Sequence, residues 1–253
     1  MAEQVAFNRD CMEAMKEFPD KFFDLAVVDP PYGGGAERER ERENGLHGGG
    51  SEWDTRKRSR FGGLFDKYHI ENGGDVVKEI PKGTTGAAVA DIRHWDIAPP
   101  PEYFTELARV SKNQIIWGGN YFDLPPTRCF LIWRKLSISE NFSMAMAEYA
   151  WTSFDGNAKL FEYAPQDSKR FHPTQKPKAL YDWIYRLYAT KGMKILDTHL
   201  GSGSSRIAAY DAGLDFWGYE IDKFYFEKQE ERFEKHTSQL NLFVEPEQTD
   251  LFN

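Results

Sequence analysis

The sequence predicts an α/β protein built on one mostly parallel β-sheet, and three observations support this fold class. Short β-branched or aromatic segments alternate with segments of helical spacing along most of the chain. The 253 residues, 40% of them hydrophobic, are enough to bury one large core. The longest apolar runs, such as FLIW at 130–133, are far too short to span a bilayer. We therefore expect a single soluble domain with helices on both faces of its sheet.

Seven segments are predicted to be strands because they are short, β-branched or aromatic, and bounded by Gly, Pro, Asp or Asn. They are VAFNR (5–9), DLAVVD (24–29), QIIWGG (114–119), RCFLIWRK (128–135), AEYAWTSF (147–154), KILDTHL (194–200) and DFWGYEID (215–222). Helices are predicted between them at 11–17, 102–110, 178–189, 205–212 and 223–236. The segments 128–135 and 147–154 are expected to close the sheet as an antiparallel edge pair.

The α/β pattern is interrupted after residue 33 by ERERERE, GGGS and RKRSR. We expect 34–91 to be a mobile insertion that faces a ligand, since binding loops sit at strand ends. A solvated excursion without function is the alternative. The remaining pattern predicts one domain over 1–236 and a flexible tail at 237–253.

Charge and cysteine content narrow the function classes. Residues 215–253 contain ten acidic and four basic residues, so −6 of the net charge of −8 lies there. The basic run RKRSR at 56–60, and the stretch 128–178 with eight basic and five acidic residues, provide local positive surface for a polyanion. Cys11 and Cys129 form no CxxC pair or Cys/His cluster, so neither a metal site nor a disulfide is predicted. No signal sequence is visible, and we expect a cytoplasmic protein.

Three predicted strand ends carry distinctive residues, and open α/β sheets bind ligands beyond the carboxyl ends of their strands. One strand runs through Asp197 into a turn formed by Gly201, Ser202 and Gly203. Glycines let the backbone approach a ligand closely, although such turns also serve helix packing alone. Glu220 ends the next strand, 17 residues after Gly203, where an acidic residue accepts hydrogen bonds from ribose hydroxyls in dinucleotide-binding folds.

The third strand end is DPPYGGG at 29–35. Two prolines stiffen the backbone, so that Asp29, a backbone carbonyl and the Tyr32 ring form a preset unit. A packing role in the core is the alternative for Tyr32, but the neighbouring prolines and glycines disfavour it.

These motifs together resemble a known family. DPPY, GSG after a strand-end Asp, and FHPTQKP at 171–177 are similar to motifs of the S-adenosylmethionine-dependent DNA amino-methyltransferases. DPPY precedes GSG, which resembles the order in the circularly permuted beta class, and NQIIWGGNYFDLPP resembles small phage- and prophage-type adenine methylases. The resemblance covers about 5–236 without the insertion. It implies a seven-stranded, circularly permuted Rossmann-like methyltransferase sheet, double-stranded DNA as partner, and a homodimer as one candidate assembly.

The resemblance also implies an S-adenosylmethionine site at the strand ends. Its methionine portion is expected among Asp197, Leu200, Gly201, Ser202 and Gly203, with Thr174 and Lys176 close to the carboxylate. Its ribose is expected at Glu220, and its adenine at Asp10 and Cys11. An N-cap role for Asp10 is compatible with this. This chain departs from the family at Thr198 and His199, where Pro-Phe is usual, which puts the local packing around the cofactor in doubt.

By the same resemblance, Asp29, Pro30, Pro31 and Tyr32 form the catalytic unit. Asp29 and the Pro30 carbonyl are expected to accept the two N–H bonds of an exocyclic amine, while Tyr32 stacks on the flipped-out base. Aspartate in this motif is typical of adenine-N6 enzymes, and cytosine-N4 methylation is the alternative. An inactive DNA-binding or clamp-binding adaptor is the alternative from another class. RNA and protein glutamine are less favoured substrates.

Two regions and a tail motif complete the expectations. Target recognition is assigned to 34–91 and 136–170, and the base pocket to residues that include Asn120, Tyr121 and Phe122, although packing is the default for Phe122. QLNLF, from Gln239 to Phe243, resembles the pentapeptide with which bacterial proteins bind the replication sliding clamp. QTDLF, from Gln248 to Phe252, is a looser copy. The alternative is an amphipathic tail packed on its own domain.

Overall fold

The computed structural model describes residues 2–33, 97–138, 145–165, 170–172 and 174–241. The chain divides into two compact units, one formed by Met1–Tyr32 and Ala98–Asn253 and the other by Gly33–Ile97. All of the described helices and strands belong to the first unit. The predicted insertion at 34–91 lies outside the described residues. None of the helices described here is both long and apolar enough to cross a membrane.

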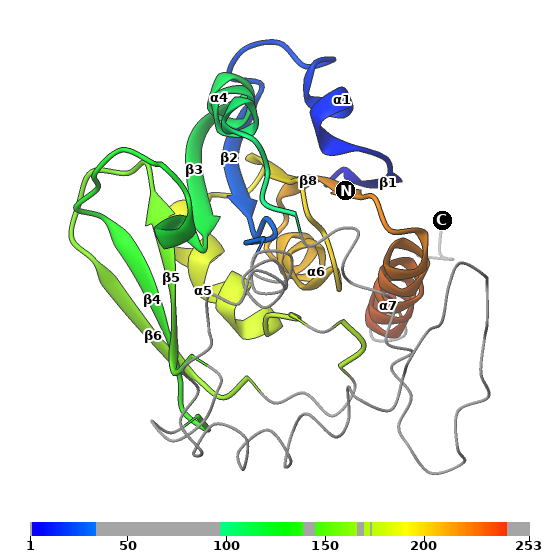
Figure 1. Cartoon of the computed structure of the whole chain (residues 1–253). Coiled ribbons are helices and arrows are strands. Elements are labelled where there is room, and N and C mark those ends of the chain that lie inside the picture. The colour runs from blue at the N-terminus through cyan, green and yellow to red at the C-terminus, as the bar shows by residue number, and fades with distance from the viewer. Residues whose placement is uncertain (1, 34–96, 139–144, 166–169, 173, 242–253) are drawn as a thin grey trace, which may run out of the picture. The chain divides into compact units, whose positions relative to one another are not determined.

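A sheet of eight strands, in the order β1-β8-β7-β2-β3-β5-β4-β6, forms the centre of the first unit (Figure 1). The strands are β1 (Gln4–Asn8), β2 (Phe23–Val28), β3 (Ser111–Trp117), β4 (Phe130–Lys135), β5 (Ala147–Thr152), β6 (Lys159–Tyr163), β7 (Lys194–Asp197) and β8 (Asp215–Glu220). All neighbours pair in parallel except β5, which is antiparallel to both β3 and β4. The predicted α/β class with a mostly parallel sheet is confirmed.

The eighth strand, β6, was not among the seven predicted. Among the described strands it pairs with β4 alone and forms an edge of the sheet, so the antiparallel pair of β4 and β5 forms as predicted but does not end the sheet. Leu160 and Tyr163 are exposed on β6. An edge strand with little buried surface has a weak hydrophobic pattern, and this explains why the sequence did not reveal it.

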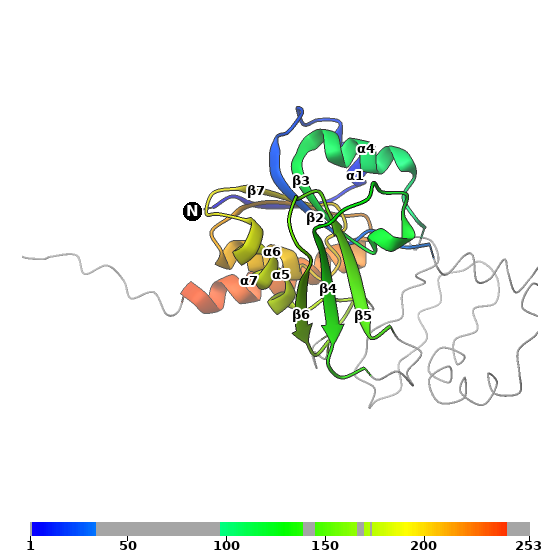
Figure 2. The same cartoon turned by 90° about the vertical axis from the view of Figure 1, so that its left-hand side faces the viewer.

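Helices cover both faces of the sheet (Figures 1 and 2). They are α1 (Cys11–Met15), α4 (Pro101–Val110), α5 (Lys178–Tyr188), α6 (Ser204–Asp211) and α7 (Lys223–Asn241). The side chains of β2 show how the sheet holds two layers. Leu25 and Val27 belong to the core cluster that includes α5 and α6, whereas Ala26 and Val28 belong to the cluster that includes α1 and α4. Period-two alternation with apolar residues on both faces is typical of a buried parallel strand.

The strand order places a ligand-binding edge between β7 and β2. β7 continues through α6 to β8 on one side, and β2 leads to β3 on the other, so the direction of winding reverses between them. The carboxyl ends of β1, β8, β7, β2 and β3 share one edge because these strands are parallel. Open α/β sheets bind their ligands at such a switch point.

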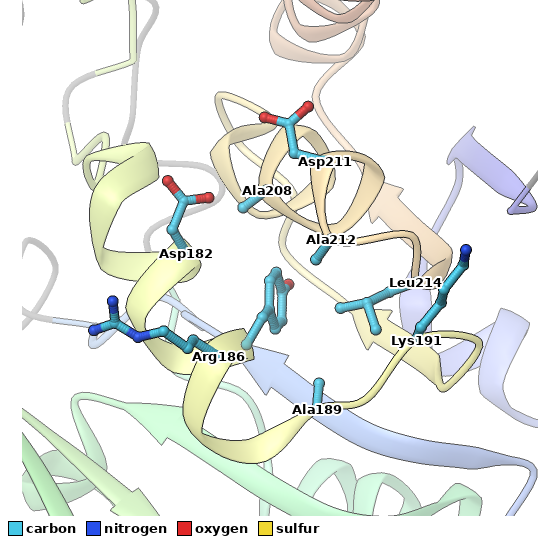
Figure 3. Close-up of a pocket in the computed structure, with 9 residues that line it drawn as sticks. Asp182, Arg186, Ala189, Lys191, Ala208, Asp211, Ala212 and Leu214 are labelled. Carbon is cyan, nitrogen blue, oxygen red and sulfur yellow. The ribbon is translucent and has the colours of Figure 1, made fainter.

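A cavity of about 290 Å³ lies elsewhere, between α5 and α6 (Figure 3). Lys191 and Leu214, which contribute to its lining, precede β7 and β8, so the cavity lies at the amino ends of the strands. The buried Tyr185 hydroxyl also lines it and has no hydrogen-bond partner among the described residues. The cavity is therefore separate from the edge that carries the predicted catalytic motif.

Candidate active site

The DPPY motif follows directly from the buried strand β2. Asp29 comes immediately after Val28, and the Tyr32 hydroxyl donates a hydrogen bond of 2.8 Å to Asp29 Oδ1. Burial raises the pKa of Asp29, although the nearby Lys176 ammonium opposes this change. Burial and the Asp29 charge also raise the pKa of Tyr32, which therefore remains a neutral donor. The motif thus holds a carboxylate and an aromatic ring together at the end of the strand.

The Tyr32 ring is embedded in residues that follow β3. It stacks on Tyr121 with ring centroids 4.8 Å apart and an interplanar angle of 21°, and it meets Phe122 edge-on at 6.2 Å. Gly118 has φ +68°, and a Cβ there would collide with the Tyr32 ring. Phe122 also packs on Phe104 of α4, which supports the packing role considered for it. Tyr121, in contrast, is 61% exposed and belongs to the 3-10 turn Gly119–Tyr121.

A chain of buried charges reaches Asp29 from β4 and β5. The Lys176 ammonium contacts Asp29 Oδ2 and lies 3.1 Å from Glu148 Oε2, and Lys135 Nζ lies 2.5 Å from Glu148 Oε1. The Lys176 side chain is only 3% exposed. Burial opposes ionisation of Glu148, but the two ammonium groups hold its pKa at about 2. Burial likewise disfavours the charge of Lys176, yet Asp29 and Glu148 raise its pKa above the usual value.

The glycine turn after β7 is held by two carboxylates. Asp197 accepts hydrogen bonds from the His199 N–H at 3.1 Å and from the Ser205 hydroxyl, and burial raises its pKa to about 7. The N–H of Gly201 donates to Glu220 Oε2 at 2.8 Å. Gly201 and Gly203 have φ +51° and +72°, the left-handed conformation that glycine adopts without strain. Gly203 directly precedes α6.

The FHPTQKP segment connects the glycine turn with DPPY. A Cβ added to Gly201 would lie 3.4 Å from His172 Nε2, so the imidazole lies against the turn. The Thr174 N–H donates to His172 Nδ1 at 3.4 Å, and burial lowers the pKa of His172 to about 4. The imidazole is therefore neutral near pH 7. Four residues later, Lys176 contacts Asp29.

The ends of β1 and β8 are joined beside Glu220. The Asn8 side-chain amide donates to the carbonyls of Glu220 and Ile221 at 2.8 and 3.1 Å. Asp10 accepts a hydrogen bond of 3.0 Å from the Glu13 N–H and caps α1, which confirms the N-cap role considered for it. Burial raises the pKa of Cys11 to about 12, so this residue is present as a thiol.

The residues at this edge suit a cofactor with a ribose and a flat ring. Glu220 accepts backbone hydrogen bonds that include those from Gly201 and Asp222, and a carboxylate has lone pairs for about four, so it retains acceptor capacity for a hydroxyl. Ile221 follows it with 61% of its surface exposed and offers an apolar face. The glycine turn brings backbone close to the same place. These observations fit an adenosine-type ligand.

Most of the predicted cofactor residues lie together in the structure, but Thr174 and Lys176 differ from expectation. Asp197, Leu200, Gly201, Ser202, Gly203 and Glu220 form the turn and the strand end, and Asp10 and Cys11 begin the adjoining α1. Thr174 is exposed. Lys176 was expected near the methionine carboxylate of the cofactor, but its ammonium lies between Asp29 and Glu148. The cofactor contacts of these residues stay predictions.

Three site residues were absent from the sequence prediction. Lys135 and Glu148 belong to strands that were predicted, and their only signal was a charged residue in an otherwise apolar or aromatic strand. Tyr103 of α4 forms a buried hydrogen bond of 2.5 Å with Thr198 Oγ1. That bond shows how the chain accommodates threonine where the family usually has proline.

Nearly half of the chain matches a known protein family. Residues 109–231 match the DNA methylase family of N6 and N4 enzymes (N6_N4_Mtase). The chain is 22% identical over 261 residues to the type II methyltransferase M2.MboI of Moraxella bovis, which covers 92% of this chain and 89% of that protein. It is 33% identical over 76 residues to the type II methyltransferase M.HpaI of Haemophilus parainfluenzae, but these are only 23% of that protein.

Two solved structures share the fold at low sequence identity. The M1.HpyAVI–SAM complex superposes with a TM-score of 0.51 at 17% identity, over 92% of this chain and all of that one. The PvuII DNA methyltransferase, which is cytosine-N4-specific, superposes with a TM-score of 0.52 at 12% identity, over 95% of this chain and 93% of that one. The family match covers 123 of the 253 residues, and the two solved structures show that this chain shares the methyltransferase fold.

Proposed function

We propose that this protein transfers a methyl group from S-adenosylmethionine to the N6 amine of a flipped-out adenine in DNA. The observation that carries the proposal is the arrangement at the switch point. Asp29 and Tyr32 leave β2 beside the glycine turn of β7, with His172 on that turn and Lys176 on Asp29. A methyl acceptor at DPPY would therefore adjoin a methyl donor at the turn.

Asp29 and Pro30 supply the groups that activate the amine. An exocyclic amine of adenine is a weak nucleophile because its lone pair is delocalised into the ring. When Asp29 and the Pro30 carbonyl accept its two N–H bonds, the nitrogen becomes pyramidal and directs its lone pair outward. The bound cofactor supplies an electrophilic sulfonium methyl. Asp29 accepts the proton that the nitrogen loses as its bond to the methyl group forms.

Tyr32 supplies the surface for the flipped base. Flipping costs a few kcal/mol of stacking and pairing energy, and stacking on an aromatic ring returns about 1–3 kcal/mol. Tyr121 covers one face of the Tyr32 ring in the free protein. Because Tyr121 is mostly exposed, its side chain has room to move aside when a base arrives.

The choice of adenine rests on the first residue of the motif. Asp29 resembles the aspartate of adenine-N6 enzymes, whereas cytosine-N4 enzymes more often carry serine there. The family match covers enzymes of both kinds, and one structural relative is cytosine-N4-specific. Cytosine-N4 methylation is therefore the second candidate.

The decisive experiment incubates the purified chain with DNA and isotope-labelled S-adenosylmethionine, followed by mass spectrometry of the nucleosides. Labelled N6-methyladenine is expected. Labelled N4-methylcytosine would overturn the choice of base. If no labelled nucleoside forms and calorimetry shows no cofactor binding, an inactive adaptor with this fold becomes the better account.

The substitution Asp29→Ala tests the assigned chemistry. It removes the acceptor for the amine but leaves the glycine turn and Glu220 in place. We expect transfer to fall by at least about 1,000-fold, since one preorganised acceptor contributes on the order of 10²–10³ and general-base action adds to it. Calorimetry should show cofactor affinity close to that of the wild type. Loss of both properties would show that Asp29 acts on folding instead.

We also propose that the tail binds the replication sliding clamp. Residues 239–241 form the end of α7, and the remainder of QLNLF and all of QTDLF lie outside the described residues. Support therefore comes from the sequence alone, in which Leu and Phe side chains suit apolar pockets and Gln a polar anchor. Deletion of 242–253 should abolish retention of the protein on immobilised clamp. Unchanged retention would refute the proposal.

A further inference from the structure

Asp29 lies at one end of a chain of charges with alternating sign. The chain runs from Lys135 on β4 to Glu148 on β5, then to Lys176 before α5, and ends at Asp29 after β2. The two lysine side chains are 8% and 3% exposed, and the Glu148 and Asp29 side chains are 22% and 15% exposed. Four elements that are distant in sequence thus contribute one side chain each.

A series of ion pairs of this kind does little to stabilise a fold. Removing charges from water costs several kcal/mol per ion, and apolar residues of similar volume often stabilise a fold equally well. The Lys176 side chain is almost fully shielded from water. It lies between two carboxylates, and the face of Trp117 is 5.4 Å away. A role in the chemistry of Asp29 accounts for the arrangement better than folding does.

Several titratable groups from neighbouring elements influence Asp29, and among the described residues only one of them, Lys176, is a cation. The groups that the structure shows are Tyr32, Tyr103, Glu148, Lys176, Tyr181 and Asp197. The three tyrosines are neutral because burial raises each pKa. The two other carboxyl groups disfavour a negative charge on Asp29 when they are ionised. Lys176 therefore provides the positive charge that favours the carboxylate.

We propose that Lys176 is a positioning residue that keeps Asp29 ionised and oriented, and that Glu148 and Lys135 hold the ammonium in place. The inference rests on the proposed function, in which Asp29 accepts hydrogen bonds from the amine. The Tyr32 hydroxyl occupies one lone pair on Oδ1 and Lys176 one on Oδ2. A carboxylate has about four such positions, so acceptor capacity remains for the amine in a fixed direction.

The roles of Lys176 and Glu148 predict opposite effects on pH dependence. Lys176→Met removes the cation, so Asp29 should ionise only at higher pH. Glu148→Gln removes a neighbouring anion and leaves the ammonium to Asp29 alone, so Asp29 should ionise at lower pH. An opposite charge in contact typically changes the pKa of a carboxyl group by about 1–3 units.

The test is the pH profile of single-turnover methyl transfer, with saturating DNA and S-adenosylmethionine. The acid limb should shift up by at least about one pH unit in Lys176→Met and down in Glu148→Gln. Lys176→Arg retains the charge and should restore most of the wild-type limb. Shifts of the same sign, or no shift in either variant, would overturn the proposal.

Glu230→Gln is the matched control. Glu230 of α7 lies 2.6 Å from the buried guanidinium of Arg206, so this substitution also removes the carboxylate partner of a buried cation. Neither Glu230 nor Arg206 lies next to DPPY in the sequence, and among the described residues neither contacts it. The acid limb of this variant should coincide with that of the wild type, because its change in charge lies away from Asp29.

A second measurement does not depend on activity. Without Lys176, nothing opposes the effect of burial in the same way, so the pKa of Asp29 rises further and the stability that its protonated form contributes is lost as the pH rises. Lys176→Met should therefore be destabilised more at pH 8 than at pH 5, relative to the wild type, in urea unfolding. Equal destabilisation at both values would refute the charge pairing. A wild-type protein without transfer activity would refute the proposed function, whereas active protein with an unmoved acid limb would refute the positioning role alone.

Discussion

The hydroxyl and the ring of Tyr32 make different contacts. Its hydroxyl binds Asp29, and its ring is available for stacking once Tyr121 moves. The hydroxyl restrains the ring in the free protein and at the same time occupies one oxygen of the carboxylate. Substitutions that separate the hydroxyl from the ring therefore distinguish the two contributions.

Tyr32→Ala should weaken productive DNA binding much more than Tyr32→Phe. Loss of the ring removes about 1–3 kcal/mol of base stacking, equivalent to roughly 5- to 150-fold in KM or Kd. Tyr32→Phe retains the ring and loses only the hydrogen bond to Asp29, which contributes about 0.5–1.5 kcal/mol, so its loss should be roughly 2- to 13-fold. Fluorescence anisotropy with substrate DNA measures both. Equal losses would assign the effect to the hydroxyl.

The sequence predicted several residues well because their signals are local. Asp29 follows a β-branched strand and precedes two prolines, and Asp10 stands where an N-cap is expected. The partner of Lys176 was not predictable in the same way. Its contact with Asp29 depends on how the segment before α5 returns to the end of β2, and this arises only from tertiary packing. Glu148 was missed for the same reason.

At the scale of elements, the turn after β3 sets the shape of the candidate base pocket. The chain passes from β3 through Gly118 in the left-handed region into the turn Gly119–Tyr121. This sharp change of direction places Tyr121 over the Tyr32 ring. Glycine is required at 118 on two grounds, the positive φ and the absence of a Cβ that would meet the ring.

Gly118→Ala should impair methyl transfer beyond its cost in stability. The left-handed backbone costs about 1–2 kcal/mol for a residue with a Cβ, and the clash displaces Tyr32 as well. Gly192→Ala is the control, since Gly192 has φ +82° and no atom within 4 Å of an added Cβ. It should lose similar backbone stability but keep its transfer rate. Urea unfolding and single-turnover assays measure the two effects, and equal rates would exclude displacement of Tyr32.

Element prediction succeeded where the pattern was strong. All seven predicted strands are present, and α4, α5 and α6 begin and end within one residue of expectation. The weak edge strand β6 was missed, and α7 continues to Asn241 rather than ending at residue 236. Residues 237–241 contain no glycine or proline to end the helix, so the sequence had no stop signal at residue 236.

At the scale of the whole molecule, buried histidines connect the site with global stability. Burial lowers the pKa of both His172 and His199 to about 4. An unfolded histidine has a pKa of about 6.5, so unfolding takes up protons between these values. Each neutral imidazole therefore lowers the free energy of unfolding as the pH falls below about 6.5. Asp197, with a raised pKa of about 7, acts in the opposite direction.

Comparison of His172→Asn with the wild type isolates one of these contributions. From pH 7 to pH 5 the wild type should lose about 2 kcal/mol more unfolding free energy than the variant, because only the wild type takes up a proton at this position on unfolding. Contributions of Asp197 and His199 cancel in the difference. Urea unfolding at both pH values measures it. Parallel losses in the two proteins would mean that the folded imidazole titrates normally.

The segment from His172 to Lys176 has a consequence for the geometry of the whole reaction centre. One end touches the glycine turn and the other touches the carboxylate of DPPY. The direct pairing of β2 with β7 sets the spacing between the proposed donor and acceptor sites. Because His172 and Lys176 are only four residues apart and touch one site each, a change in the length between them would disturb the glycine turn and Asp29 together.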